Sequence, residues 1–268
     1  MTASPTSLLH HARRGEGPPL VLVHALGGSS VMWNAVFDRL AAGREVVTLD
    51  LPGFGRSPAL PAGSSYTAPA LAAVVGEFCQ SIGIERPHVA GVSHGGWVAL
   101  EIGRAGDAAS VAAISPAGLW AKPLGTHRFD PGRRATVLLR HAISIAMLVP
   151  RVRAAVLGAS VANPARVPVD EAREMVGFYL NAPGYPATSR AMRAGVFERP
   201  EEVEVPVTIA WGRRDRLVGR PRPYRMPPQT RYVEPAHWGH VPMWDDPEGV
   251  ARLLLEASSD SDRPARPG

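Results

Sequence analysis

PHVAGVSHGGWVALEIGRA, residues 87–105, predicts a strand, a sharp turn and a helix in immediate succession. A short apolar-leaning run, residues 88–90, leads into Gly91-Val92-Ser93-His94-Gly95, which matches the pattern G-x-S-x-G, and residues 97–104 continue with helical spacing. Glycines two positions before and after the serine leave room for a strained backbone. We expect the turn to lift the Ser93 hydroxyl clear of the sheet, with the His94 N–H at a helix N-terminus, where it can stabilise an anion. The same five residues can also form a purely structural turn, so the context must decide.

Outward from this stretch, apolar runs alternate with helical periodicity. The runs at 19–23, 44–50, 111–114 and 205–211 predict buried strands, and shorter strands are expected at 230–233 and, at an edge, at 8–13. Helices are expected at 33–40, 66–82, 134–148, 170–180 and 247–257. Alternating strands and helices predict an α/β fold with a mostly parallel sheet of about seven or eight strands, covered by helices on both faces.

The strand pattern stops between about Ala117 and Glu204, where Arg, Ala and Pro are frequent and only amphipathic helical pieces remain. We therefore expect residues 1–116 and 205–257 to form one core and residues 117–204 to form an inserted helical cap. A disordered tail is expected over residues 258–268. With 268 residues, the chain is long enough for one such domain and too short for two of ordinary size.

Composition narrows the class of protein. A single cysteine, Cys79, excludes an intramolecular disulfide and a cysteine-based metal cluster, and its apolar helical setting predicts a buried thiol. The formal net charge is +5, but the arginines are scattered among acidic residues without a nucleic-acid-binding motif, so no nucleic-acid partner is expected. No signal peptide or membrane span is evident in the pattern, and a cytoplasmic location is the expectation.

Three polar residues lie just beyond apolar runs or in the loops that follow them. They are Ser93, Asp215 and His240, in that chain order. In open parallel sheets, ligands bind outside the carboxyl ends of the strands, so these side chains are expected at one edge of the sheet. Ser followed by Asp and then His is the order found in hydrolases that carry the serine on a strand-to-helix turn.

Together with three further motifs, this arrangement resembles the α/β-hydrolase fold superfamily, in its cap-bearing branch of serine hydrolases. The motifs are HALGG at 24–28, DLPGFGRS at 50–57, GVSHGG at 91–96, and WGRRDRLV with GHVPMWDDP near the end, and the resemblance covers the chain from about residue 18 to 255. It implies Ser93 as nucleophile, His240 as base, Asp215 as the carboxylate that orients it, and the N–H groups of Leu26 and His94 as oxyanion donors. In this sequence Ala25 stands where glycine is common, and the short N-terminal part has room for about one edge strand.

These roles are chemically consistent. A serine hydroxyl needs a neighbouring imidazole to accept its proton, and the imidazolium that forms needs an anion on its other nitrogen. His237 is the nearest alternative base, but the Gly-His-x-Pro pattern favours His240. His24 is expected to brace the oxyanion loop, Asp50 to hold turns together, and Asp245 and Asp246 to cap the last helix. The histidines do not cluster with carboxylates at metal-ligand spacing, so no metal or cofactor is expected.

The sequence therefore predicts a Ser-His-Asp hydrolase that cleaves a carboxylic ester or a related acyl substrate through an acyl-enzyme. The expected partner is a hydrophobic small molecule, because the cap contains Trp120, Met147, Leu148, Met175, Phe178 and Tyr179, although these residues can equally form the core of the cap. A carbon–carbon bond hydrolase, a perhydrolase or an aminopeptidase of the same fold remains open. Dehalogenase and epoxide hydrolase chemistry is disfavoured, since those relatives carry aspartate in place of Ser93, and a non-catalytic binding protein would need no triad.

Overall fold

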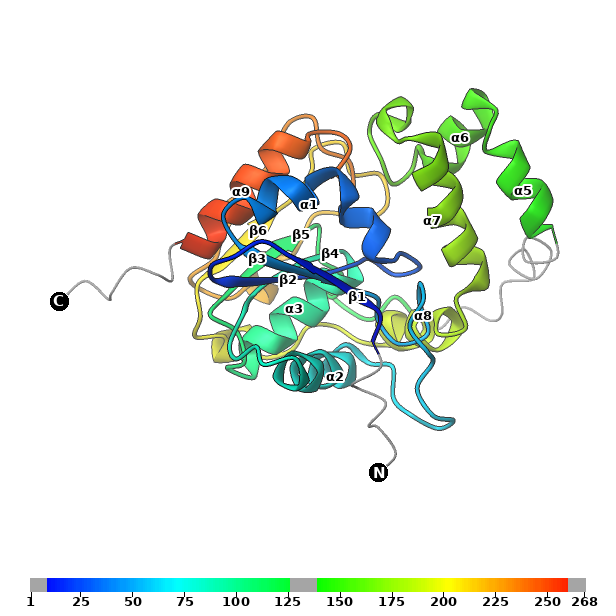
Figure 1. Cartoon of the computed structure of the whole chain (residues 1–268). Coiled ribbons are helices and arrows are strands. Elements are labelled where there is room, and N and C mark those ends of the chain that lie inside the picture. The colour runs from blue at the N-terminus through cyan, green and yellow to red at the C-terminus, as the bar shows by residue number, and fades with distance from the viewer. Residues whose placement is uncertain (1–8, 126–138, 260–268) are drawn as a thin grey trace.

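A seven-stranded sheet forms the centre of the molecule in a computed structural model that describes residues 9–125 and 139–259. The order of the strands is β1-β3-β2-β4-β5-β6-β7; β1 is antiparallel to β3, and every other neighbouring pair is parallel (Figure 1). The strands are β1 (His11–Arg14), β2 (Pro19–Val23), β3 (Glu45–Leu49), β4 (His88–Val92), β5 (Ser110–Ile114), β6 (Val207–Ala210) and β7 (Arg231–Val233). The predicted mostly parallel sheet is confirmed, with seven strands.

Helices cover both faces of this sheet. Helices α1 and α9 pack against each other on one side, while α2 and α3 pack together on the other, with α3 on β4 and β5 (Figure 1). The helices are α1 (Asn34–Ala41), α2 (Ala68–Ser81), α3 (His94–Arg104), α5 (Arg140–Ala146), α6 (Pro150–Leu157), α7 (Val169–Asn181), α8 (Tyr185–Ala194) and α9 (Pro247–Ser259), with 3-10 turns at 30–33, 164–166, 200–202 and 223–225.

The core is divided by the sheet because successive side chains of a strand point to opposite faces. In β2, Val21 and Val23 pack on the face with α2 and α3, whereas Leu20 and Leu22 pack on the face with α1 and α9. All four side chains are fully buried or nearly so, as a strand covered on both faces requires. This pattern is why β2 was visible in the sequence as a continuous apolar run.

The edge strand lies later in the chain than its sequence suggested. A strand was expected at 8–13, whereas β1 covers His11–Arg14 and all four of its residues are exposed. Its position is set by pairing with β3, in which His11 faces Leu49 and Arg14 faces Val46. Because backbone hydrogen bonds to β3 fix this strand and its side chains are exposed, the sequence shows no apolar pattern that would mark its bounds.

Between β5 and β6, the described residues contain helices and no strand. Of the helix expected at 134–148, residues 140–146 form α5, and residues 134–138 lie outside the described part. Figure 1 shows α5, α6 and α7 gathered on one side of the molecule, beyond the end of the sheet. None of the helices in the described ranges combines the length and apolar character needed to cross a membrane.

The end of the last helix corrects the predicted start of the tail. Disorder was expected from residue 258, but α9 continues to Ser259, and Ser258 is buried. The Ser258 hydroxyl accepts a hydrogen bond from Arg44 Nε at 3.0 Å and donates to Leu255 O. These polar contacts hold the last turn of α9, where the sequence has no apolar periodicity. The other tail residues, 260–268, lie outside the described part.

Candidate active site

Ser93 stands at the turn between β4 and α3 in a strained conformation. Its φ of 56° and ψ of −118° are rare for a residue with a side chain. The strain is held by hydrogen bonds on both sides: Ser93 N–H donates to Ile114 O at 2.9 Å, and Ser93 O accepts from the N–H groups of Trp97 and Ala117. The predicted strand–turn–helix is present, and the turn is fixed by β5 and the segment that follows it.

The two glycines of the motif are required by close backbone contacts. A Cβ at Gly91 would lie 2.1 Å from Gly95 O, and a Cβ at Gly95 would lie 2.3 Å from Val23 O and 2.5 Å from His24 O. These approaches are far shorter than van der Waals contact. The start of α3 therefore packs directly on the end of β2, which brings the loop after β2 next to Ser93.

Asp215 and His240 are hydrogen-bonded to each other. Asp215 follows β6, His240 follows β7, and His240 Nδ1 lies 2.8 Å from Asp215 Oδ2. The other carboxylate oxygen, Oδ1, accepts from the N–H groups of Leu217 and Val218 at 2.8 and 3.0 Å. With its Nδ1 proton facing a carboxylate, the imidazole presents Nε2 as its basic nitrogen.

Burial and hydrogen bonding compete at this carboxylate. The side chains of His240 and Asp215 are only 4% and 1% exposed. Burial alone raises the pKa of Asp215, but the hydrogen bond and charge of His240, together with the two backbone N–H groups, outweigh it and hold the pKa below its ordinary value. Asp215 is thus kept as an anion beside the imidazole.

Ser93 opens into a cavity of about 400 Å³. The cavity wall also includes Leu217 and Val218, whose N–H groups hold Asp215. Within the described residues, no hydrogen bond joins the Ser93 hydroxyl to His240. Catalytic hydrogen bonds of this type often tighten only when substrate binds. The structure thus joins two of the three predicted catalytic side chains by a hydrogen bond and places the third, Ser93, in the wall of a cavity that also contains the two residues whose N–H groups hold Asp215.

The loop after β2 carries the expected oxyanion donor Leu26. His24 braces this loop: its Nδ1 donates to Ala25 O at 2.8 Å and its Nε2 accepts from Leu51 N at 2.9 Å, which fixes the neutral tautomer. Burial lowers the pKa of His24, against the charge of Asp50 and the hydrogen bond to Ala25. The backbone N–H groups of Leu26 and His94 donate no hydrogen bond to any described residue.

Helices α7 and α8 lie over the loop after β2. A Cβ at Gly27 would lie 2.6 Å from a ring carbon of Tyr179 and 3.2 Å from a ring carbon of Tyr185, and the two tyrosine rings meet edge to face at 5.1 Å. Gly27 also has a φ of +75°, which favours glycine. The helical segment between β5 and β6 thus covers the loop that leads to Leu26.

His94 contributes its backbone to the turn, while its ring is buried in the core. The ring contacts Trp97 edge to face, and neither of its nitrogens has a hydrogen-bond partner among the described residues. Burial, with a smaller effect of the His24 ring, lowers the pKa of His94 to about 3. This imidazole is therefore neutral near pH 7, and with so low a pKa it is too weak a proton acceptor to be a good general base.

The other polar residues singled out by the sequence have structural contacts. Asp50 accepts from the N–H groups of Ser30 and Arg56, and so links two turns. His237 is exposed, in contrast to the buried His240. These positions agree with the expectations for both residues.

The two acidic residues before α9 differ from each other. Asp246 caps the helix by accepting from Gly249 N at 3.0 Å, as expected. Asp245 was also expected to cap the helix, but its carboxylate instead accepts from the N–H groups of Gly239, Ala162 and Asn163 at 2.7 to 3.0 Å. The sequence could not show this role, because the partners lie up to 83 residues away.

The cavity beside Ser93 is mainly apolar, but it uses few of the residues expected to select the substrate. Among the six apolar residues named in the cap, only Trp120 is in its described lining. Met147 is fully buried in the core and Leu148 is 52% exposed, while Met175 and Tyr179 pack against the core. The alternative interpretation, that such residues form the core, holds for Met147, Met175 and Tyr179 but not for the exposed Leu148. The cavity instead uses Leu119, Met192, Trp211, Leu217 and Val218.

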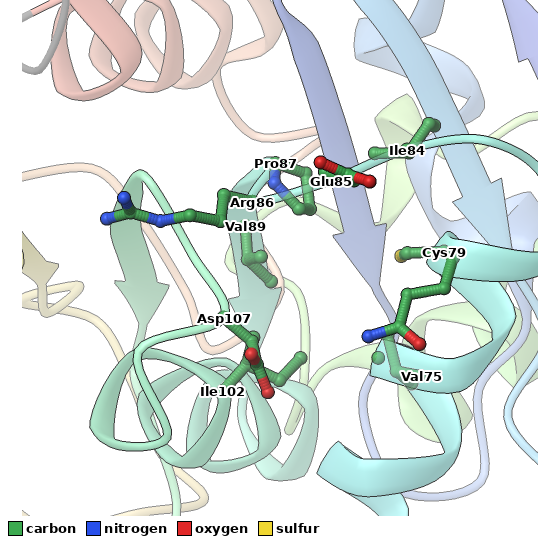
Figure 2. Close-up of a pocket in the computed structure, with 11 residues that line it drawn as sticks. Val75, Cys79, Ile84, Glu85, Arg86, Pro87, Val89, Ile102 and Asp107 are labelled. Atoms are coloured by element: carbon green, nitrogen blue, oxygen red, sulfur yellow. The ribbon is translucent and has the colours of Figure 1, made fainter.

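A second cavity lies near the amino end of β4, at the end of the strand away from Ser93. Figure 2 shows the residues around it, among them Cys79 of α2, Ile102 of α3 and Val89 of β4. Its volume is about 240 Å³, and Asp107 also lines it. Burial raises the pKa of Cys79 to about 12, so its thiol is protonated and a poor nucleophile. Within the described residues, no group of three or more His, Cys, Asp or Glu could hold a metal ion. Of the two cavities, the one beside Ser93 is therefore the better candidate for an active site.

A family model described as the alpha/beta hydrolase family matches residues 20–253. The chain belongs to this family. The match includes the turn at Ser93, the loop at Leu26 and both members of the Asp215–His240 pair.

Individual relatives match shorter parts of the chain. A segment of 115 residues is 41% identical to the dihydrolipoyllysine-residue acetyltransferase component of an acetoin cleaving system from Cupriavidus necator, and covers 41% of this chain and 30% of that protein. A segment of 93 residues is 41% identical to a pimeloyl-[acyl-carrier protein] methyl ester esterase from Aeromonas salmonicida, and covers 34% of each chain. The matches thus span about a third of these relatives.

The whole fold is shared with solved structures at lower identity. The enol-lactonase from Burkholderia xenovorans superposes with a TM-score of 0.73 at 22% identity, covering 94% of this chain and 96% of that one. This likeness concerns the fold, and the chemistry must be argued from the residues of the site.

Proposed function

We propose that this protein is a serine hydrolase that cleaves a carboxylic ester or a related acyl substrate through a covalent acyl-enzyme. The observation that carries the proposal is the strained turn that puts Ser93 in the wall of a cavity. The hydrogen-bonded pair of His240 and Asp215 near this cavity supports it. A strained serine on its own would cost stability without benefit, and nucleophilic catalysis gives that strain a purpose.

In the proposed reaction, Ser93 Oγ attacks the carbonyl carbon of the ester while His240 Nε2 accepts the hydroxyl proton. Asp215 accepts the Nδ1–H bond and stabilises the imidazolium that forms. His240 then donates the proton to the leaving alcohol, which leaves the acyl group on Ser93. A water molecule activated by the same imidazole releases the acid and restores the serine. These steps require neither a metal nor a cofactor.

The negative charge that develops on the carbonyl oxygen would be stabilised by the N–H groups of Leu26 and His94. Both groups remain unbonded among the described residues, and the loop that carries Leu26 is held rigid by His24. Donors that are already oriented stabilise such a transition state without reorganisation, and removing one typically costs about 3 kcal/mol. We propose further that residues 117–204 act as a cap, because α7 and α8 cover this loop.

The experiment is to measure kcat/KM on 4-nitrophenyl esters of graded chain length. We expect Ser93→Ala and His240→Ala each to lower kcat/KM by about 10⁴-fold or more, because members of a triad act as a unit. His237→Ala is the matched control: it removes an exposed histidine three residues away and should leave kcat/KM within about twofold. Full activity in the folded Ser93→Ala variant would contradict the proposal.

A further inference from the structure

The wall of the Ser93 cavity carries positively charged side chains. It contains three arginines, Arg193, Arg220 and Arg222, and none of the described residues that line the cavity is Asp or Glu. The remaining lining is mostly apolar. A cavity with an apolar wall and cationic groups suits a molecule that has both an apolar and an anionic part.

The three guanidinium groups differ in the partners they already have. Arg220 forms an ion pair with Glu234, which balances its charge. Arg193 donates from Nε to Gly125 O at 3.2 Å, and its two terminal nitrogens have no partner among the described residues. The Arg222 guanidinium has no hydrogen bond or ion pair within the described ranges. Two of the three arginines can therefore still donate to a ligand.

Backbone hydrogen bonds hold these two arginines at the same wall. Arg222 N donates to Leu119 O and Leu124 N donates to Arg193 O, each at 2.9 Å. Trp120 adds a hydrogen bond from its indole N–H to Gly195 O, also at 2.9 Å. The segment after β5, the end of α8 and the loop after Asp215 are thus joined around one opening. Because these hydrogen bonds join the three segments that form the wall, they also hold Arg193 and Arg222 at the cavity.

Some other arginines of this protein meet a carboxylate of the chain itself. Arg13 pairs with Glu45, Arg56 with Glu174 and Arg231 with Glu256. A guanidinium presents several N–H donors in a plane and matches the oxygens of carboxylate and phosphate. The chain supplies no such partner to Arg222 among the described residues, so the partner at this wall can come from the substrate.

We propose that the substrate is an anionic ester, with a carboxylate or phosphate group remote from the bond that is cleaved, and that Arg193 and Arg222 bind this group at the cavity wall. The inference rests on the proposed function, because it places the ester carbonyl at Ser93. It also refines that function, since it gives a role in substrate binding to two arginines of the cavity wall that have no carboxylate partner among the described residues.

The test compares esters of equal reactivity that differ in charge. One arm uses the mono-4-nitrophenyl ester of adipic acid against 4-nitrophenyl hexanoate, and the other uses the hexanoyl ester of glycerol 3-phosphate against that of glycerol. The first arm puts a carboxylate on the acyl part, and the second puts a phosphate on the alcohol part. We expect kcat/KM to favour the charged ester by about tenfold in one of the arms, and the preference to shrink in 0.5 M NaCl because salt screens exposed charges.

The variants identify the residues responsible. Arg193→Gln with Arg222→Gln should bring the ratio of kcat/KM for the charged ester to kcat/KM for the neutral ester down to about one. Arg39→Gln removes one exposed positive charge on α1, away from the cavity lining, and should leave the preference unchanged. This control separates local binding from a general effect of net charge.

The outcomes distinguish the inference from the function beneath it. Hydrolysis of neutral and charged esters at equal rates in both arms, or a preference that survives the double substitution, would overturn the inference while the hydrolase stands. Failure to hydrolyse any of the four esters, with no covalent reaction at Ser93, would overturn both.

Discussion

At the scale of single residues, the candidate site depends on a backbone that only a few residue types tolerate. Ser93 is held at positive φ between two glycines at which an added Cβ would collide with neighbouring carbonyl oxygens. The sequence could predict this turn because the whole requirement lies within five consecutive residues. It could not predict the partners of Asp245 or the position of Arg222, because those contacts join segments far apart in the chain.

Gly95→Ala should destabilise the protein by about 2 kcal/mol or more, because the new Cβ would lie 2.3 Å from Val23 O and the backbone must move. Gly177→Ala, in α7, is the matched control: no atom lies within 4 Å of its added Cβ, and alanine favours a helix by up to about 1 kcal/mol. Urea unfolding measures both changes. Equal stability of Gly95→Ala and the unmodified protein would show that the packing at the turn is looser than described.

The buried His94 predicts a loss of stability in acid. Burial lowers the pKa of His94 to about 3, whereas in the unfolded chain it is near 6.5. Between these values the unfolded chain binds a proton that the folded protein does not, so the free energy of unfolding falls as the pH falls. In His94→Met this contribution disappears, and the ring it replaces has no hydrogen bond to lose among the described residues.

Unfolding in urea at pH 7 and pH 5 measures this effect. The unmodified protein should lose about 2 kcal/mol more than His94→Met between the two pH values. The contribution of His24 is common to both proteins and cancels in the comparison. Parallel losses would mean that His94 is protonated in the folded protein or reaches water.

At the scale of elements, buried strands were the easiest to predict and exposed or polar ones the hardest. β2 is marked by a continuous apolar run, whereas the exposed β1 is defined by its pairing with β3 and was placed too early. The expected end of α9 was also too early, since its last turn is held by polar contacts of Ser258. Periodicity detects a face that is buried against the core, and hydrogen bonds between distant segments leave no such signal.

Asp245 joins two elements that the sequence treated separately. Its carboxylate accepts from Gly239 N, next to His240, and from the N–H groups of Ala162 and Asn163 in the helical segment between β5 and β6. A further hydrogen bond, from Val241 N to Ser160 O at 2.8 Å, runs alongside. One buried side chain therefore fixes the loop of the proposed base to that segment.

Asp245→Asn should lower the free energy of unfolding by about 2 kcal/mol or more, since an amide NH₂ would face a buried N–H group that loses its acceptor. Asp170→Asn, at a carboxylate that is 98% exposed, should change it by less than about 1 kcal/mol. Guanidinium unfolding followed by circular dichroism checks both. A fully stable Asp245→Asn protein would show that the carboxylate does not hold these segments.

At the scale of the whole molecule, the sheet brings together residues from four separate loops. Leu26, Ser93, Asp215 and His240 follow β2, β4, β6 and β7, and the carboxyl ends of these parallel strands share one edge. The sequence predicted this convergence for Ser93, Asp215 and His240, because each lies just beyond an apolar run or in the loop that follows it, whereas Leu26 was implied by the resemblance to the hydrolase superfamily. It did not predict the composition of the cavity, because the residues that line it come from segments that approach each other only in the folded chain.

The central claim is that Ser93 is a nucleophile activated by His240 and Asp215, and covalent labelling with a fluorophosphonate probe tests it most directly. We predict that the unmodified protein gains the mass of one probe, that peptide mapping places it on Ser93, and that folded Ser93→Ala and His240→Ala do not react. His237→Ala should be labelled like the unmodified protein. Absence of labelling in the folded, unmodified protein, or undiminished labelling of Ser93→Ala, would contradict the account.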